Sequence, residues 1–245
     1  MVLSNNLCYF YVLKFLMISL ALTTYQRTDL LFNSFVNVVN SDLIDEIIIV
    51  DDCSSKVVCN KLQMILSPNS KIKLHFNPVN LGMSLNKKHA ISLCKNEWVV
   101  IFDSDNELNE KYLLSLNRRS PFDANTIYAP ARALPNFDYS AFSSITLSKD
   151  NVKEYIHKPY FGALINTCNY MVHRDTYLAN YNHNEEIRGT DTAWHFYNHL
   201  KNGGKFHVVP DLEYSHLVHD KSTFLEHVDY NMKKAKEIEN LLMEL

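Results

Sequence analysis

An apolar run that ends abruptly in acidic residues, EWVVIFDSDNE at positions 97–107, constrains the fold of this chain more than any other feature. Its five consecutive apolar residues, Trp98 to Phe102, are β-branched or aromatic and predict a strand buried on both faces. The residues that end such a strand lie in the crevice at the carboxyl edge of the sheet, where open α/β proteins bind ligands. Asp103 and Asp105 stand at this edge, and their carboxylate oxygens suit a divalent cation.

A second predicted strand ends in the same way. The EIIIV run at 46–50 leads directly into DDCS at 51–54. Alone, one acidic strand end is explained equally well as a helix cap, because Asp and Ser are preferred there. Two acidic ends on strands that we expect to be neighbours favour a ligand site.

The first hundred residues alternate between strand and helix patterns, which indicates βαβ units and a largely parallel sheet. Right-handed crossovers place the carboxyl ends of such strands at one edge. Strands are expected at Phe15–Leu22, Glu46–Val50, Lys71–Phe76 and Trp98–Phe102. Helices are expected at Asp29–Asn40, Val57–Leu66 and Ser84–Cys94.

The pattern becomes less regular after Asn106. Helices are expected at Glu110–Asn117, from Thr190 or Asp191 to Asn202 with Gly203 and Gly204 ending it, and from Thr223, which forms a capping box with Glu226. Strands are expected at Thr126–Ala131, Ala163–Ile165, Tyr170–His173 and Lys205–Val209, and residues 132–160 are interpreted as irregular structure or a mobile loop. The last helix should pack on the domain or on a partner subunit through an apolar stripe of Phe224, Val228, Ala235, Ile238, Leu242 and Leu245.

Composition narrows the class of protein. A length of 245 residues with 47% hydrophobic residues suits one α/β domain with a substantial core. The net charge of −3 gives no electrostatic case for nucleic acid as a partner. Five scattered cysteines without a CxxC pair favour a reducing compartment. Lys14 interrupts the apolar residues 7–22, so we interpret them as leading into the first buried strand rather than as a membrane span.

Several motifs occur in an order that resembles the family 2 glycosyltransferases, which have the nucleotide-diphospho-sugar transferase (GT-A) fold. These motifs are TYQR at 24–27, EIIIVDDCS at 46–54, NLGMS at 80–84, DSDN at 103–106, GTD at 189–191, GGK at 203–205, VPD at 209–211 and YSH at 214–216. The resemblance covers roughly residues 15–220. Because several motifs keep their order and spacing, it is specific for the fold and much less specific for the sugar.

The resemblance implies a role for each matching residue. Asp191 would be the catalytic base, Asp105 and His216 would contact Mn²⁺ or Mg²⁺, and Asp52 would accept a hydrogen bond from a uracil-like base. The nucleotide-sugar-binding residues would be Thr24, Tyr25, Arg27, Asp52, Asn80, Gly82, Lys87, Asp103 and Ser104. A metal bridging the two phosphates would neutralise the leaving group, and a carboxylate would activate the acceptor hydroxyl.

The chain also departs from the family pattern. Family members often have Ala-Arg-Asn where this chain has Asn86, Lys87 and Lys88. Lys87 would therefore offer the diphosphate a single ammonium charge rather than the bidentate guanidinium of an arginine. Family members commonly have a Glu-Asp pair near the catalytic base. This chain has Thr190 and Asp191 there, so only the second residue of the pair matches.

Plainer interpretations of these residues stay open. Asp191 also suits the first turn of a helix, where the helix dipole favours acids. His216 and His219 also suit a surface pair or a structural zinc site. Asn80 and Gly82 also suit a turn.

Competing classes are a haloacid-dehalogenase-like phosphatase and a response-regulator receiver. Both place their acidic motif on the first strand, whereas DSDN here follows the fourth. A non-catalytic relative that binds a sugar nucleotide or a glycan is the principal alternative to an enzyme.

We therefore expect a single α/β GT-A domain with a Rossmann-like, mostly parallel mixed sheet flanked by helices, and a C-terminal helix. Residues 15–107 would form the nucleotide-binding half, 108–222 the acceptor and catalytic half, and 223–245 the C-terminal helix. The expected activity is inverting, metal-dependent hexosyl or N-acetylhexosaminyl transfer from a UDP-sugar to a glycan or glycoconjugate. The expected location is the cytoplasm or the membrane surface, with a homo-oligomer or a peripheral membrane contact through the last helix.

Overall fold

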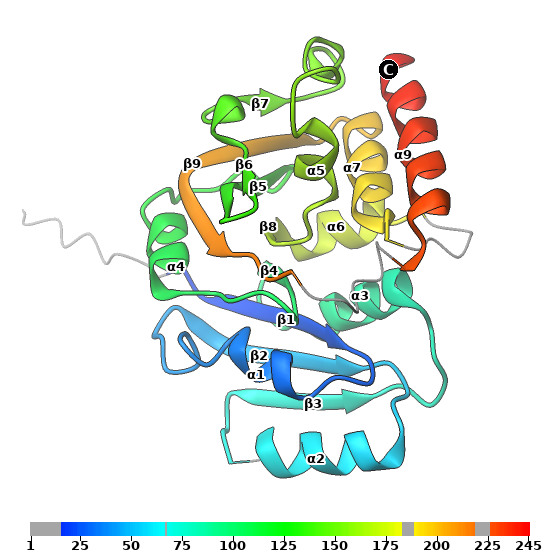
Figure 1. The fold of residues 1–245 in the computed structure, drawn as a ribbon. Coiled ribbons are helices and arrows are strands. Elements are labelled where there is room, and N and C mark those ends of the chain that lie inside the picture. The colour runs from blue at the N-terminus through cyan, green and yellow to red at the C-terminus, as the bar shows by residue number, and fades with distance from the viewer. Residues whose placement is uncertain (1–15, 67, 183–188, 219–225) are drawn as a thin grey trace, which may run out of the picture.

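A computed structural model describes residues 16–66, 68–182, 189–218 and 226–245 (Figure 1). Within these residues a nine-stranded mixed sheet has the order β3-β2-β1-β4-β8-β5-β9-β7, and β6 pairs with β5. The strands are β1 (Ile18–Thr24), β2 (Ile44–Asp51), β3 (Ile72–Phe76), β4 (Trp98–Asp103), β5 (Thr126–Leu134), β6 (Phe137–Asp138), β7 (Thr146–Leu147), β8 (Tyr170–His173) and β9 (Lys205–Ser215). The α-helices are α1 (Asp29–Asn33), α2 (Lys56–Leu66), α3 (Met83–Ser92), α4 (Glu110–Asn117), α5 (Phe161–Asn166), α6 (Arg174–Asn180), α7 (Asp191–Lys201) and α9 (Val228–Met243).

The first four strands form the parallel half of the sheet, as the alternating pattern predicts. The central residues of β1, β2 and β4 are buried because helices cover the sheet, which explains the continuous apolar runs of β2 and β4, whereas β3 at the edge is only half-buried. β4 does not follow β3 in the sheet but returns to the other side of β1. The prediction that the two acidic strand ends lie on neighbouring strands is therefore wrong, since β1 lies between β2 and β4.

Beyond β4 the sheet changes direction. β8 runs antiparallel to both β4 and β5, while β9 runs parallel to β5. β9 is longer than the predicted Lys205–Val209 because the strand continues past Pro210. The pairing of β5 with β9 shifts register between Pro130 and Arg132. Proline has no backbone N–H to donate to the ladder, and this irregularity accommodates the prolines of the two strands, Pro130 and Pro210.

One prediction for the second half is wrong. Ala163–Ile165 is not a strand but part of α5, because Phe161, Leu164 and Ile165 share one helical face and are buried. Residues 132–160, interpreted as irregular structure or a mobile loop, are largely irregular but also contain β6, β7 and two short 3₁₀ helices, η1 (Ser140–Phe142) and η2 (Val152–Glu154). Apolar side chains of this segment, such as Phe142 and Leu147, are buried in the core. The Pro, Ser and Asn content of the sequence gives no indication of this packing.

Helix α9 packs against α7 at the end of the molecule opposite α2 and β3 (Figure 1). Ile238 and Leu242 are buried, as the apolar stripe predicts, whereas Val228 is exposed. Thr223 and Phe224 lie outside the described residues. The helix expected at 29–40 is shorter in the structure: α1 ends at Asn33, and the chain continues as turns.

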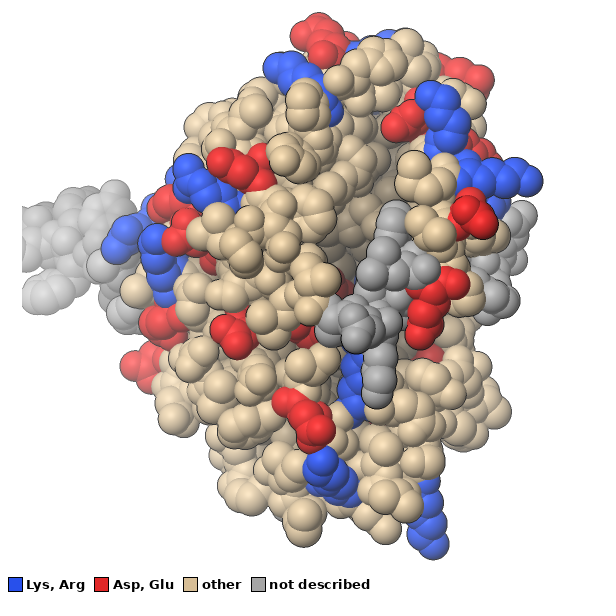
Figure 2. Space-filling model, in the orientation of Figure 1, with Lys and Arg blue, Asp and Glu red and all other residues tan. Residues whose placement is uncertain are grey.

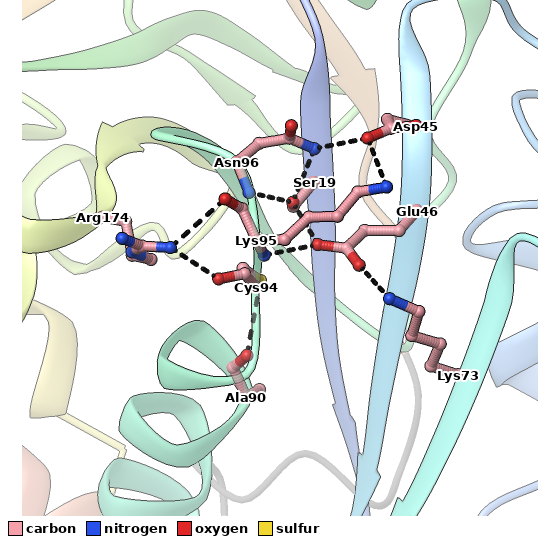
Figure 3. A network of polar contacts seen from close by, with 9 residues as sticks. All are labelled: Ser19, Asp45, Glu46, Lys73, Ala90, Cys94, Lys95, Asn96 and Arg174. Carbon is pink, nitrogen blue, oxygen red and sulfur yellow. Dashed lines mark hydrogen bonds and ion pairs between the residues drawn. The ribbon is translucent and has the colours of Figure 1, made fainter.

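A buried polar network joins β1, β2 and the start of β4 at the amino edge of the sheet (Figure 3). Glu46 is its centre and accepts hydrogen bonds from Ser19 Oγ at 2.7 Å, Lys73 Nζ at 2.6 Å and the Lys95 amide at 2.6 Å. Burial by itself would raise the pKa of Glu46, but these donors outweigh it and the pKa lies below its ordinary value. The network therefore fixes the strands at the edge opposite the predicted site.

Acidic and basic side chains are interspersed on the face of the molecule that Figure 2 shows. Across the described residues, no helix has the length and apolar character needed to cross a membrane.

Candidate active site

The carboxyl ends of three strands meet where the sheet reverses its order. Thr24 of β1 pairs with Asp51 of β2, and Thr23 pairs with Asp103 of β4. The chain goes to β2 on one side of β1 and returns to β4 on the other, so this edge is a topological switch point. The crevice outside the strand ends at such a point is where open α/β sheets bind ligands. The predicted site residues of both halves are attached to this edge.

The acidic pair of β2 builds the loops beside the crevice. Asp51 accepts hydrogen bonds from the Ser54 amide at 2.8 Å and from Ser54 Oγ at 2.5 Å. Asp52 is 3% exposed and holds the loop before α3, because its Oδ2 accepts the Gly82 amide at 2.9 Å and its Oδ1 accepts the Leu81 amide at 2.9 Å. Asn80 is exposed and also accepts the Gly82 amide, at 3.0 Å.

A further donor to Asp52 comes from the end of β3. The Asn77 amide group donates to Asp52 Oδ1 at 2.8 Å and to Asn86 Oδ1 of α3 at 2.9 Å. Asp52 thus accepts three protein hydrogen bonds. Its predicted contact with a base would be a fourth one and stays a prediction.

Asp103 is held by a residue that the sequence analysis missed. Asn169, directly before β8, accepts the Asp103 amide at 2.8 Å and donates to Asp103 Oδ2 at 3.2 Å. Tyr112 of α4 donates to the Asn169 carbonyl at 2.9 Å. The only signal in the sequence is an Asn directly before a predicted strand, and it does not indicate a contact with Asp103 until β8 is known to pair with β4.

Arg27 and Asp105 form an ion pair across the crevice. Arg27 Nη1 lies 2.7 Å from Asp105 Oδ2, and each side chain is 22% exposed. Thr24 Oγ1 donates to the Arg27 carbonyl at 3.2 Å and so orders the turn after β1. Tyr25 on the same turn is 50% exposed, and Ser104 is buried. The structure therefore brings the TYQR and DSDN motifs together.

Lys87 of α3 joins two carboxylates from distant parts of the chain. Its Nζ lies 3.0 Å from Asp191 Oδ2 and 3.8 Å from Asp103 Oδ1, and its side chain is 7% exposed. Burial by itself would lower the pKa of Lys87, but Asp191 and Asp103 outweigh it, so the pKa lies above its ordinary value. The ammonium is therefore charged, and the predicted base lies beside DSDN.

The pKa of Asp103 is shifted as well. Burial raises it, Lys87 opposes the rise, and the carboxylates of Asp105 and Asp191 add to it, so that the pKa lies above its ordinary value. Shifts of this kind, caused by burial and specific charged partners in a cleft, are typical of functional sites.

Asp191 begins α7, and the backbone before it is fixed from two sides. Asn166 of α5 donates to the Gly189 carbonyl at 2.8 Å and accepts the Ala193 amide at 3.4 Å. Gly189 has a φ of +75°, and a Cβ built there would lie 2.7 Å from Asn231 Nδ2 of α9. Both α5 and α9 therefore position the segment that carries Asp191.

We expect Gly189→Ala to lower the free energy of unfolding by about 2 kcal/mol, because it adds both a positive-φ penalty and a close contact with Asn231. Thermal melting measures the loss. Gly162→Ala is the matched control, since nothing lies within 4 Å of a Cβ there. Equal melting temperatures for the two variants would contradict the close packing of α9 on Gly189.

His216 follows β9 and lies beside the DSDN turn, but its ring is engaged by another residue. Its Nδ1 lies 2.8 Å from Asn136 Oδ1, and its ring packs against Phe137 at a centroid distance of 5.1 Å. The Leu217 amide donates to Asn106 Oδ1 at 3.1 Å, which ties this segment to DSDN. His219 lies outside the described residues.

The described residues do not assemble a complete metal site by themselves. In the part of the chain that the structure describes, no group of three or more His, Cys, Asp or Glu side chains could hold an ion. The predicted metal contacts of Asp105 and His216 stay predictions.

The sheet with its switch point, the covering helices and the acidic strand ends define a GT-A fold, and comparisons with known proteins identify the family. Glycosyl transferase family 2 matches residues 19–181, and the chain belongs to that family. The structure is similar to that of S. aureus TarS 1–349, with 15% identity and a TM-score of 0.62 over 91% of this chain and 65% of that one.

A second similar structure is GalNAc-T7 with UDP, GalNAc and Mn²⁺, with 14% identity and a TM-score of 0.64 over 85% of this chain and 44% of that one. The chain thus spans less than two thirds of the length of these solved proteins. A search of curated proteins finds no match.

Proposed function

We propose that this chain is a metal-dependent, inverting glycosyltransferase that moves a sugar from a UDP-sugar to a hydroxyl of a glycan or glycoconjugate. One observation carries the proposal: five charged residues from four separate segments converge on the switch point of the sheet, namely Arg27, Lys87, Asp103, Asp105 and Asp191. Packing alone does not require so many charges at one edge. Residues 15–107 would hold the nucleotide, and later segments would hold the acceptor.

The nucleotide assignment rests on position and on one similar structure. Tyr25 is exposed at the end of β1 and offers a face on which a base can stack. GalNAc-T7 carries UDP and Mn²⁺, which favours a uridine nucleotide here. Hexosyl and N-acetylhexosaminyl donors are both compatible with these residues.

The residues present fit a metal that arrives with the nucleotide. Asp105 supplies one hard carboxylate ligand, and nucleotide-bound Mg²⁺ or Mn²⁺ commonly takes only one or two protein carboxylates beside phosphate and water. When bound, such an ion would neutralise the charge of the departing diphosphate. Arg27, which pairs with Asp105, lies beside this carboxylate and would offer its guanidinium to the phosphates.

The remaining chemistry falls to Asp191. A hydroxyl is a weak nucleophile, and a positioned carboxylate that takes its proton as the new bond forms is sufficient for a single displacement with inversion. Lys87 holds this carboxylate at 3.0 Å and keeps it beside Asp103. Burial of Asp191, which is 6% exposed, limits competition from bulk water.

We expect UDP to bind more tightly with Mn²⁺ than in EDTA, and Asp105→Ala to remove most of this difference, because it deletes the protein ligand. Isothermal titration calorimetry with UDP measures both. Asp150→Ala is the matched control, since Asp150 is an exposed carboxylate after β7. If EDTA has no effect on UDP binding and Asp105→Ala behaves like wild type, the metal role is wrong.

A further inference from the structure

We infer that Lys87 is a positioning residue that fixes the Asp191 carboxylate next to Asp103, and that it does not bind the diphosphate. The catalytic role of Lys87 rests on the proposed function. The ion pairs of Lys87 with Asp191 and Asp103 are observed in the structure and are independent of that function. This inference replaces the role that the family resemblance implies for Lys87.

The first argument is burial. Lys87 lies on the inner face of α3 with Ser84, Asn86, Ala90 and Ile91, all of them buried. Only 7% of its side chain is exposed, and a buried ammonium must be compensated by opposite charge. Asp191 at 3.0 Å and Asp103 at 3.8 Å supply that compensation from within the protein.

The second argument is charge balance. Asp103 and Asp191 approach the same ammonium from β4 and α7, so without Lys87 they would repel one another in a poorly solvated place. With Lys87 present, two negative charges and one positive charge share the site. The side chain is therefore committed to the two carboxylates, and a diphosphate would have to compete with both.

The third argument is the presence of a better placed cation. Arg27 is 22% exposed at the crevice, carries a guanidinium that can bind phosphate through two N–H groups, and pairs with Asp105 rather than with the base. Arg27 therefore suits the diphosphate, and Lys87 suits the base.

The test compares Lys87→Met with Lys88→Met, because Lys88 is the next residue of α3 and lies over the Tyr181 ring, 4.8 Å from its centroid. UDP binding with Mn²⁺ is measured by calorimetry. The kcat of UDP release is measured with UDP-glucose, UDP-galactose and their N-acetylhexosamine counterparts. We expect Lys87→Met to lower kcat by about 100-fold, as misplacement of a catalytic group does, while the Kd for UDP changes by less than about threefold.

Lys88→Met should change neither quantity. Lys87→Arg, which keeps the positive charge, should retain more activity than Lys87→Met. A loss of UDP affinity of about tenfold or more in Lys87→Met, with a proportionate loss of transfer, would assign Lys87 to the diphosphate and overturn the inference.

A double-mutant cycle on the melting temperature tests the coupling of Lys87 with Asp191 without measuring the proposed activity. Lys87→Met should lower the melting temperature because it leaves two carboxylates without their cation. Adding Asp191→Asn should restore part of that loss. If the two losses simply add, Lys87 and Asp191 are not coupled and the inference fails. A wild-type protein that binds no UDP would refute the proposed function, while the cycle would still decide on the pair.

Discussion

Asp191→Asn is expected to lower the rate of sugar transfer by about two to four orders of magnitude, the range for a positioned general base. The substitution keeps the size of the side chain and its place at the start of α7 but removes the proton acceptor. UDP binding should change little, because the residues that we propose for nucleotide binding lie at the ends of β1 and β2. The melting temperature should also change little, since Lys87 keeps Asp103 as a partner.

The matched control is Asp175→Asn. Asp175 is likewise an acid in the first turn of a helix, α6, but its side chain is 67% exposed and pairs with Arg174. If both residues serve only the helix dipole, the two variants will behave alike. Near-normal transfer by Asp191→Asn, or loss of transfer only through unfolding, would show that Asp191 is not the base.

Glu46→Ala is expected to lower the free energy of unfolding by about 3 kcal/mol, because it removes a buried charge and leaves its donors unpaired. This loss is at the low end for a buried ion pair because Lys73 is 48% exposed and solvent screens its charge. Urea unfolding measures the loss. Asp45→Ala is the control, since Asp45 is the neighbouring residue of β2 and its partner Lys95 is 53% exposed. Equal losses would contradict the central place of Glu46 in the network.

The same carboxylate has a predictable pH dependence. The folded-state pKa of Glu46 lies below its ordinary value of 4.5, so its stabilising effect is complete above that value and is lost as the pH falls through the folded pKa. Glu46→Gln removes the titration. The stability difference between wild type and Glu46→Gln should therefore shrink as the pH falls below about 4.5. A difference that stays constant down to pH 2 would show that Glu46 does not titrate with folding.

The parallel half of the fold could be predicted from the sequence because its signals are local. The buried strands β2 and β4 are continuous apolar runs, and the helices between them follow the expected spacing, so their predicted bounds are nearly right. The order of the strands could not be predicted from such runs. β1 separates the two acidic ends, because strand order depends on crossovers rather than on local pattern.

The secondary structure of the second half was harder to predict, because its strands and helices are mostly short and their apolar runs are too brief to show a period. Ala163 to Ile165 is too short a run to separate a strand from a helix by its pattern, and the tertiary packing of Phe161 on Phe142 and on Phe196 of α7 accompanies the helix α5. The same limit applies to the site. Motif order predicts Asp103, Asp105 and Asp191 as site residues, and the structure brings them near one another. The contact of Asn169 and the pairing of Lys87 arise only when β8, α3 and α7 come together.

The most direct test of the proposed function is a donor screen. UDP-sugars and GDP-sugars are incubated with the protein and a panel of glycan acceptors, in Mn²⁺ and in EDTA, and release of the nucleoside diphosphate is followed together with the glycan product. We expect at least one UDP-sugar to be turned over in Mn²⁺, with product that falls sharply in EDTA and in Asp191→Asn. Binding of UDP without product from any donor would contradict an enzyme and favour a non-catalytic sugar-nucleotide-binding protein.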